Sequence, residues 1–188
     1  MDSVKPWKTL ARRTVFTHSK YLTVETHTVE LPDGRIIPDW PWIITPDYIN
    51  VIAWTEEGKW LCFRQTKYAL EGISLAPVGG YIEPGEDPLE AAKRELREET
   101  GYEAPEWVHL GSYTVGANRG IATGHLYLAC GAYYVTEPKS DDLEEQELLL
   151  LDTTEVEEAL AQGEFKALSW AANVALALLY LRRSGKLP

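Results

Sequence analysis

The stretch RELREETG, residues 94–101, contains three glutamates whose spacing could do chemistry: Glu95, Glu98 and Glu99. In a helix, residues three and four apart share one face, and like charges there cost roughly 0.2–0.5 kcal/mol per pair. A bound cation would relieve this repulsion, because Mg²⁺ is usually held by a few carboxylates while substrate phosphates and water complete its octahedron. The spacing therefore indicates a metal-binding face, with a solvated acidic face as the alternative.

Signals at both ends predict that this stretch belongs to a helix over residues 88–100. Asp87 can cap the helix, Pro88 fits its first turn, and Gly101 can end it in a left-handed conformation. The preceding loop, GGYIEPGEDP, has glycines that let the backbone approach a ligand. We therefore expect a loop that can lie beside phosphate, followed by a helix that carries carboxylates.

The spacing of the fixed residues resembles the complete box of the Nudix hydrolase family. The chain reads Gly80, five residues, Glu86, seven residues, Arg94-Glu95-Leu96, one residue, Glu98-Glu99, one residue and Gly101. With common residues at about 7% usage each, seven fixed matches would arise by chance about once in 10⁸ windows. The resemblance implies a Nudix-like α/β/α sandwich with a mixed β-sheet, which hydrolyses a nucleoside diphosphate linked to another group.

The resemblance also implies a set of metal ligands. Glu95, Glu98 and Glu99 would bind the metal, and a backbone carbonyl of Gly79 or Gly80 would help. Mg²⁺ is the expected cofactor, with Mn²⁺ as the alternative. The metal would neutralise the pyrophosphate oxygens and activate a water.

Two further residues of the box have implied roles. Arg94 would orient a glutamate through a bidentate ion pair. Glu86 would support the box, either as the partner of Arg94 or near a second metal. A general base is also needed, and a glutamate near the metals, such as Glu98, is the usual choice in such sites.

The rest of the chain resembles the ADP-ribose pyrophosphatase branch of this family. WLCFRQTKYALEGISLAPVGGYIEPGE contains an apolar strand, an Arg-Gln pair and a Pro-x-Gly-Gly approach to the box. The branch implies ADP-ribose or a related nucleotide sugar as the small phosphorylated substrate. Dinucleoside polyphosphates, NADH and oxidised nucleoside triphosphates are alternatives, as is a non-catalytic nucleotide sensor, although a sensor would be expected to lose box carboxylates.

Two departures from this branch concern the substrate and the base. Lys67 stands where the branch often has a second arginine, and GANRGIATGHLYLA has no carboxylate. The catalytic glutamate would then come from the acidic loop EPKSDDLEEQE. In that loop Glu145 and Glu147 give the best Glu-x-Glu match, with Asp142 or Glu144 as alternatives, and a merely solvated loop is an equal alternative.

Side chains outside the box are candidates for substrate contacts. Arg64, Lys67 and Arg119 could bind phosphate or ribose, and Trp42 could stack on a base or on the next subunit. For the arginines the alternatives are a side chain that snorkels from a strand end and a turn residue. For the tryptophan the alternative is a core or interface position.

Composition limits the partners and the compartment. The net charge of −11 over 188 residues argues against a nucleic-acid partner, since affinity for phosphate backbones comes largely from Lys and Arg. No apolar run approaches the roughly 18 residues of a membrane span, and the start lacks the apolar middle of a signal peptide. We therefore expect a cytoplasmic protein without a membrane partner, in which Cys62 and Cys130 are free and buried.

The elements that must position the site are expected in one order along the chain. Residues 1–45 read as a β-rich extension, with a Pro-Asp-Gly turn at 32–34, and residues 46–188 read as the hydrolase domain. Two strands, about 49–55 and 60–65, precede the helix; further strands and two helices follow it. In the family branch such an extension commonly makes a homodimer. The four histidines are scattered without metal-ligand spacing, so we expect no Cys/His zinc site.

Overall fold

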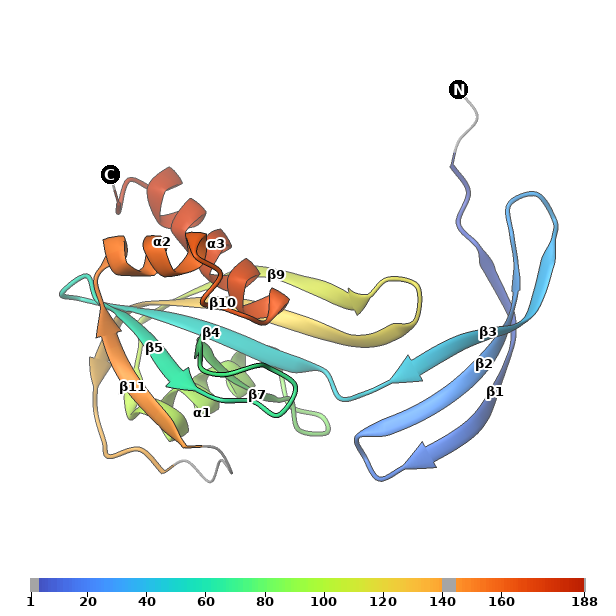
Figure 1. Ribbon diagram of the computed structural model, residues 1–188, viewed down its shortest axis with the longest axis horizontal. Coiled ribbons are helices and arrows are strands. Elements are labelled where there is room, and N and C mark those ends of the chain that lie inside the picture. The colour runs from blue at the N-terminus through green and yellow to red at the C-terminus, as the bar shows by residue number, and fades with distance from the viewer. Residues whose placement is uncertain (1–3, 140–144, 188) are drawn as a thin grey trace. The chain divides into compact units, whose positions relative to one another are not determined.

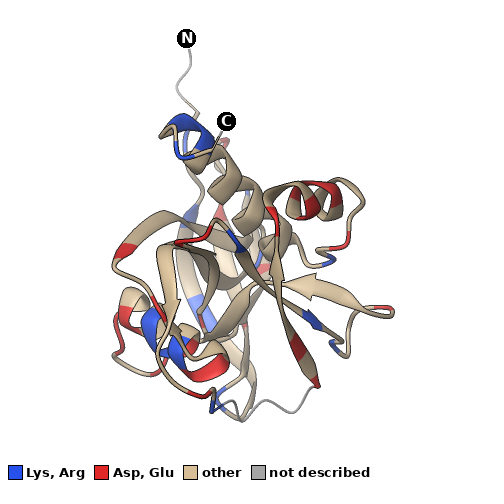
Figure 2. Ribbon diagram, turned by 90° about the vertical axis from the view of Figure 1, so that its left-hand side faces the viewer, with Lys and Arg blue, Asp and Glu red and all other residues tan. Residues whose placement is uncertain are grey.

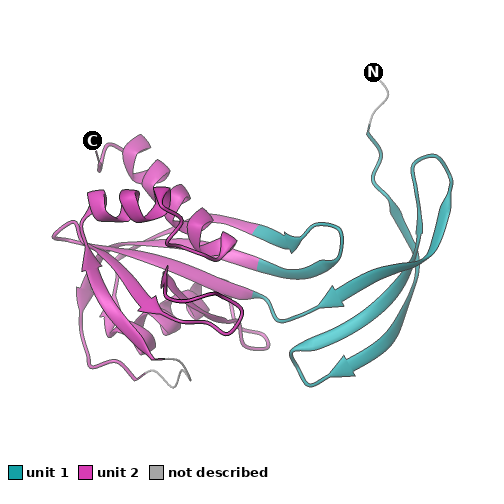
Figure 3. Ribbon diagram, viewed as in Figure 1, with its two compact units in different colours: residues 1–47, 113–123 teal, residues 48–112, 124–188 magenta. Residues whose placement is uncertain are grey.

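The computed structural model describes residues 4–139 and 145–187 and divides into two compact units (Figures 1 and 3). Unit 1 comprises residues 1–47 and 113–123, and unit 2 comprises residues 48–112 and 124–188. The short segment 113–123 therefore groups with the N-terminal strands, although it is distant from them in sequence.

Unit 1 is built on three antiparallel strands, β1 (Lys8–His18), β2 (Leu22–Glu30) and β3 (Ile36–Ile44). The turn between β2 and β3 contains Gly34 with a φ of 87°, a conformation that favours glycine. Segment 113–123 joins this unit because Gly120 and Ile121 pair in parallel with Ile43 and Ile44 of β3.

Two tryptophans of β3 hold segment 113–123 in unit 1. Trp40 Nε1 donates a hydrogen bond to the Asn118 carbonyl oxygen at 2.7 Å. Trp42 lies so close to Gly120 that a Cβ there would fall 2.3 Å from its ring. The tip of the hairpin between β9 and β10 is thus fixed by side chains from the N-terminal strands.

Unit 2 contains a mixed sheet with the strand order β10-β4-β5-β11. The strands of unit 2 are β4 (Tyr48–Thr55), β5 (Trp60–Gln65), β6 (Ser74–Ala76), β7 (Val78–Tyr81), β8 (Tyr102–Glu103), β9 (Glu106–Gly116), β10 (Gly120–Tyr134) and β11 (Gln146–Leu151), except that residues 113–116 of β9 and 120–123 of β10 belong to unit 1. β10 runs parallel to β4, whereas β5 and β7 run antiparallel to it. The helices are α1 (Pro88–Thr100), α2 (Thr153–Ala161) and α3 (Leu168–Arg183).

Two apolar cores cover the two faces of this sheet. Val51 of β4 packs in a cluster with Leu96 of α1, whereas its neighbour Ile52 packs with Val156 of α2 and Val174 of α3. Successive strand residues point to opposite faces, so α1 lies on one face and α2 and α3 lie on the other (Figure 1). The predicted α/β/α sandwich with a mixed sheet is confirmed.

Both cysteines are free and buried, as expected. Burial raises the pKa of the Cys62 thiol to about 12 and also raises the pKa of Cys130. In residues 4–139 and 145–187, no helix is long and apolar enough to cross a membrane.

Candidate active site

Helix α1 begins and ends at the residues that the sequence predicts. The Asp87 side chain accepts the N–H of Leu89 at 2.9 Å, and Gly101 ends the helix with a φ of 75°. A Cβ at Gly101 would lie 1.9 Å from the Thr136 carbonyl oxygen, and the Gly101 carbonyl accepts the N–H of Val135 at 2.8 Å. Position 101 therefore requires a glycine, because of its left-handed conformation and because the backbone just after β10 lies so close to it.

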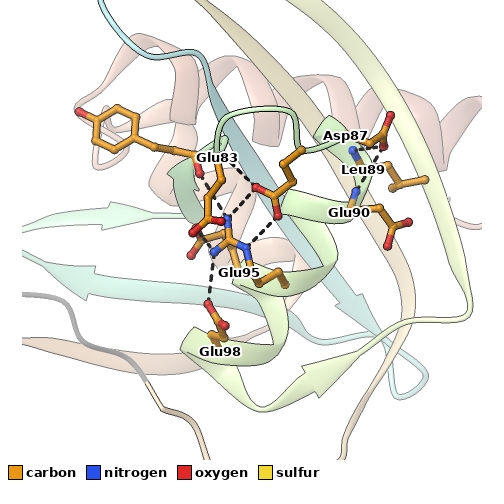
Figure 4. Close-up of polar contacts among 9 residues, drawn as sticks. Glu83, Asp87, Leu89, Glu90, Glu95 and Glu98 are labelled. Carbon is orange, nitrogen blue, oxygen red and sulfur yellow. Dashed lines mark hydrogen bonds and ion pairs between the residues drawn. The ribbon is translucent and has the colours of Figure 1, made fainter. Parts of the chain in front are cut away.

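Arg94 is the centre of a cluster of carboxylates, of which Glu95 and Glu98 are labelled in Figure 4. Its Nε and Nη2 donate to the two oxygens of Glu86 at 2.9 and 3.1 Å, which is a bidentate ion pair. Its Nη1 donates to Glu95 Oε1 at 2.7 Å and to Glu98 Oε2 at 3.2 Å. Nη2 also donates to the Tyr81 carbonyl oxygen at 3.3 Å, so one guanidinium joins the loop before the helix to two of its glutamates.

The charges in this cluster stabilise each other. Hydrogen bonds from Arg94, followed by the N–H of Glu83, lower the pKa of Glu86 below its ordinary value. Glu86 and then Glu95 raise the pKa of Arg94, which keeps the guanidinium charged. Charges of both signs lie along α1 (Figure 2). The repulsion among the glutamates is thus partly relieved by an arginine of the same helix.

Gly80 lets the Glu95 carboxylate lie directly against strand β7. A Cβ at Gly80 would fall 2.1 Å from Glu95 Oε1, so no larger residue fits without moving that glutamate. The Glu95 side chain is only 14% exposed, which shows how closely it is packed. The loop glycine and the helix carboxylate therefore meet, although they are fifteen positions apart along the chain.

The residue types of this cluster fit a divalent cation. Glu95, Glu98 and Glu99 supply hard oxygen donors, which Mg²⁺ and Mn²⁺ prefer, and Glu95 lies against the backbone of Gly80. In the described part of the chain, no three Asp, Glu, His or Cys side chains already converge on one ion position. Arg94 Nη1 instead supplies the positive charge between Glu95 and Glu98. Arg94 donates only to Oε2 of the half-exposed Glu98, so the other oxygen of this carboxylate could help hold a cation while Arg94 orients the side chain.

Comparison with known proteins identifies the family. The profile of the NUDIX domain matches residues 45–179, and the profile of the nucleoside diphosphate sugar hydrolase N-terminal domain matches residues 7–43. The chain belongs to the Nudix family. As predicted, it is a Nudix hydrolase.

Relatives of this Nudix protein match over nearly its whole length. The ADP-ribose pyrophosphatase of Bacillus subtilis is 29% identical over 175 residues, which cover 93% of this chain and 92% of the relative. The methanol dehydrogenase activator of Bacillus methanolicus is 30% identical over the same shares. A crystal structure of an ADP compounds hydrolase superposes with a TM-score of 0.80 at 20% identity and covers both chains completely. The predicted Nudix fold is confirmed.

A cavity of about 710 Å³ opens beside the Nudix helix. Its walls include Arg94 and Glu98 of α1, together with Trp107 and Lys139. This volume lies within the roughly 300–1,000 Å³ typical of small-molecule sites. A nucleotide-sized ligand therefore has room next to the carboxylate cluster.

The structure pairs two of the predicted site residues with each other. Glu147 of β11 stands opposite Arg64 of β5 in the sheet, and Arg64 Nη1 lies 3.1 Å from Glu147 Oε2. Glu145 is exposed just before β11, whereas Asp142 and Glu144 lie outside the described residues. The roles of Glu145 and Glu147 as base and of Arg64 as a substrate contact stay predictions.

The other predicted substrate contacts lie elsewhere. The Lys67 carbonyl accepts the N–H of Leu70 in a turn of unit 2. Arg119 and Trp42 belong to unit 1, where the Arg119 carbonyl accepts the N–H of Ile43 and the Trp42 ring stacks on His27 at 4.9 Å. These observations show where each residue lies in the fold, and its contact with substrate stays a prediction.

One polar group was not predicted from the sequence. His109 Nε2 and His125 Nδ1 lie 2.9 and 2.8 Å from the hydroxyl oxygen of Ser112. Spacing along the chain does not indicate this group, because the register between β9 and β10 brings the histidines together. A predicted hairpin with its turn near residues 117–119 would have indicated that His125 lies across from Ser112 and His109.

Replacing Gly80 by alanine should lower kcat about tenfold. The new Cβ would push Glu95 away from β7, since the two would otherwise lie 2.1 Å apart. Steady-state kinetics at saturating Mg²⁺ would measure the effect. Gly163→Asn is the matched control, because no described residue other than its two chain neighbours lies within 4 Å of a Cβ at Gly163 and asparagine tolerates its φ of 74°. Wild-type kcat in Gly80→Ala would contradict the importance of this contact.

Proposed function

We propose that this protein hydrolyses the pyrophosphate bond of a nucleoside diphosphate linked to another group, in a reaction that depends on a divalent metal. ADP-ribose or a related nucleotide sugar is the proposed substrate. The observation that carries the proposal is the Arg94 cluster, in which Glu86, Glu95 and Glu98 gather around Arg94 and Glu95 lies against Gly80. The expected cytoplasmic location stays a prediction.

The proposed mechanism assigns a role to each group of the cluster. Glu95, Glu98 and Glu99 would hold Mg²⁺ or Mn²⁺ with a backbone carbonyl of Gly79 or Gly80. When bound, the metal would neutralise the pyrophosphate oxygens and lower the pKa of a water. Arg94 positions Glu95 and Glu98 through its hydrogen bonds and touches no reacting atom. Glu98, or Glu145 or Glu147 of the acidic loop, would accept the proton of the attacking water.

The choice of substrate rests on the relatives and on charge. One relative that matches nearly end to end is an ADP-ribose pyrophosphatase. Another, 30% identical over 145 residues, is a hydrolase of a CMP-linked phosphonate from Streptomyces rubellomurinus. Both names describe a nucleotide joined to a second group. A protein of net charge −11 could bind such an anionic substrate if the metal bridges the two.

A substrate panel tests this function. We expect Mg²⁺-dependent release of nucleoside monophosphate from ADP-ribose or another nucleotide sugar, with no release in the presence of EDTA. Chromatography of the products would measure it against CMP-linked compounds, NADH, diadenosine polyphosphates and nucleoside triphosphates. Turnover restricted to another compound of the panel would show that this compound, and not a nucleotide sugar, is the substrate. Tight nucleotide binding without any turnover would favour a sensor.

We also propose that residues 1–45 form a dimerisation section and residues 46–188 the hydrolase domain. Every residue of β1 is exposed, including the apolar Leu10 and Phe16. Apolar side chains gathered on an exposed strand are typical of an interface. A second copy of the chain could cover them.

Sedimentation velocity tests the proposed homodimer. Leu10→Lys/Phe16→Lys should shift the protein from dimer to monomer, because charges would replace the apolar contacts. Thr17→Lys, on the same strand and also exposed, is the control that should stay dimeric. A monomeric wild-type protein, or a double variant that dimerises as well as wild type, would contradict the proposed interface.

A further inference from the structure

Asn50 is a polar residue in the middle of the apolar strand β4. Ile49 and Val51 pack in the cluster on the α1 face, so strand alternation places Asn50 on the opposite face with Ile52. Asn50 is only 3% exposed, and among the described residues its Oδ1 has no hydrogen-bond partner. Burying an amide oxygen without a partner is unfavourable. Hydrogen bonding of this oxygen therefore does not explain an asparagine at this position.

The close contact of the Asn50 side chain is with Gly79 of β7. In the antiparallel pair of β4 and β7, Asn50 stands opposite Gly79 and Ile49 opposite Gly80. A Cβ at Gly79 would lie 2.5 Å from Asn50 Nδ2, which is too close for two unbonded atoms. The amide of Asn50 therefore fills the space that a side chain at residue 79 would need.

The two successive glycines are packed from opposite faces of the strand. Glu95 lies where a Cβ of Gly80 would point, and Asn50 lies where a Cβ of Gly79 would point. Gly79 nevertheless remains exposed, so its backbone is accessible to a ligand. Asn50 and Glu95 thus hold a stretch of backbone that has no side chains of its own.

We propose that Asn50 is a positioning residue that fixes the Gly79 backbone, and with it the carbonyl offered to the divalent cation. This inference rests on the proposed function. Glycine has more backbone freedom than any other residue, so a carbonyl ligand in a Gly-Gly pair needs packing to hold its direction. Asn50 acts through Gly79 and touches neither the cation nor the substrate. Partners that orient metal ligands typically change metal affinity 10–100-fold when they are mutated.

A double-mutant cycle at positions 50 and 79 tests the proposal. Asn50→Ala should weaken Mn²⁺ binding about tenfold and lower kcat more than it changes KM, because Gly79 loses its support. Gly79→Ala alone should also weaken binding, because its methyl group meets the Asn50 amide. The double variant should recover most of the affinity, since the new methyl group takes the space that the amide leaves. Electron paramagnetic resonance of Mn²⁺ and steady-state kinetics give the two readouts.

Asn173→Ala is the matched control for loss of a buried amide. Asn173 is also buried, and its Oδ1 has no hydrogen-bond partner in the described part of the chain, but its Nδ2 donates to the Tyr127 carbonyl at 3.1 Å. This variant should lower the melting temperature and keep wild-type Mn²⁺ affinity. Asn50→Ser gives the same test if Asn50→Ala does not fold.

Two results would overturn the role of Asn50. One is a folded variant at position 50 that keeps wild-type Mn²⁺ affinity and kcat. The other is a double variant whose fold-loss of Mn²⁺ affinity equals the product of the fold-losses of the two single variants. Failure of the proposed function is distinguishable from these, because it would show as absent Mn²⁺ binding and turnover in the unmodified protein. That outcome would overturn both proposals.

Discussion

Replacing Glu98 and Glu99 together by glutamine should lower kcat/KM about a thousandfold and leave the fold intact. A loss of that size corresponds to about 4 kcal/mol of transition-state stabilisation, which is in the range that a metal ion supplies. Glutamine keeps the size of each side chain but removes the charge that would hold a cation. Kinetics with the best substrate of the panel, Mn²⁺ titration and circular dichroism would measure activity, metal binding and fold.

Glu90→Gln is the control for removal of a helix carboxylate. Glu90 lies in the first turn of α1 and pairs with Lys93 at 2.7 Å, away from the three glutamates at the other end. This variant should keep kcat/KM within about twofold, because an exposed pair of this kind contributes little. A double glutamine variant with unchanged metal affinity and turnover would contradict the assignment of Glu98 and Glu99 as metal ligands.

Replacing Arg94 by alanine should destabilise the protein by about 2 kcal/mol in the absence of metal, because several acidic groups would lose their partner. The figure is below that for a fully buried pair because Arg94 is 28% exposed, so water would screen part of the loss. The free energy of unfolding from urea denaturation would measure the effect. Turnover should fall as well, since Glu95 and Glu98 would no longer be oriented.

Mg²⁺ distinguishes this explanation from a simple packing defect. If the cation and Arg94 both neutralise the negative charge of the same carboxylates, Mg²⁺ should raise the melting temperature of Arg94→Ala more than that of wild type. Arg97→Ala is the control on the same helix, because the contact of Arg97 with Glu103 at 3.5 Å is exposed to solvent. An Arg94→Ala variant as stable as wild type, with the same response to Mg²⁺, would contradict the role of the cluster.

The sequence predicted the helix and its ends because these signals are local. Asp87 and Gly101 act on neighbouring backbone groups, and the structure places α1 between them, over the predicted residues 88–100. The sequence also indicated a bidentate pair for Arg94, with Glu86 as one of its candidate partners. The additional bonds of Arg94 to Glu95 and Glu98 depend on side-chain directions that residue types alone do not specify.

Contacts between strands could not be predicted in the same way. The pairing of Arg64 with Glu147 and the packing of Asn50 on Gly79 follow from sheet register. A shift of one residue would send each of these side chains to the other face, and no local pattern fixes that shift when the strands are far apart in sequence. The grouping of segment 113–123 with the N-terminal strands has the same origin in the pairing of Ile43 with Gly120.

Segment 113–123 has a consequence for exchanging parts between relatives. A chimera that replaced only the first 47 residues would remove Trp40 from the Asn118 carbonyl and Trp42 from Gly120. The hairpin tip would then meet foreign side chains, and a substitute for Trp42 of another shape would leave a gap beside Gly120 or collide with it. The N-terminal strands and this tip should therefore be exchanged together, because they form one structural unit from two separate segments of the chain.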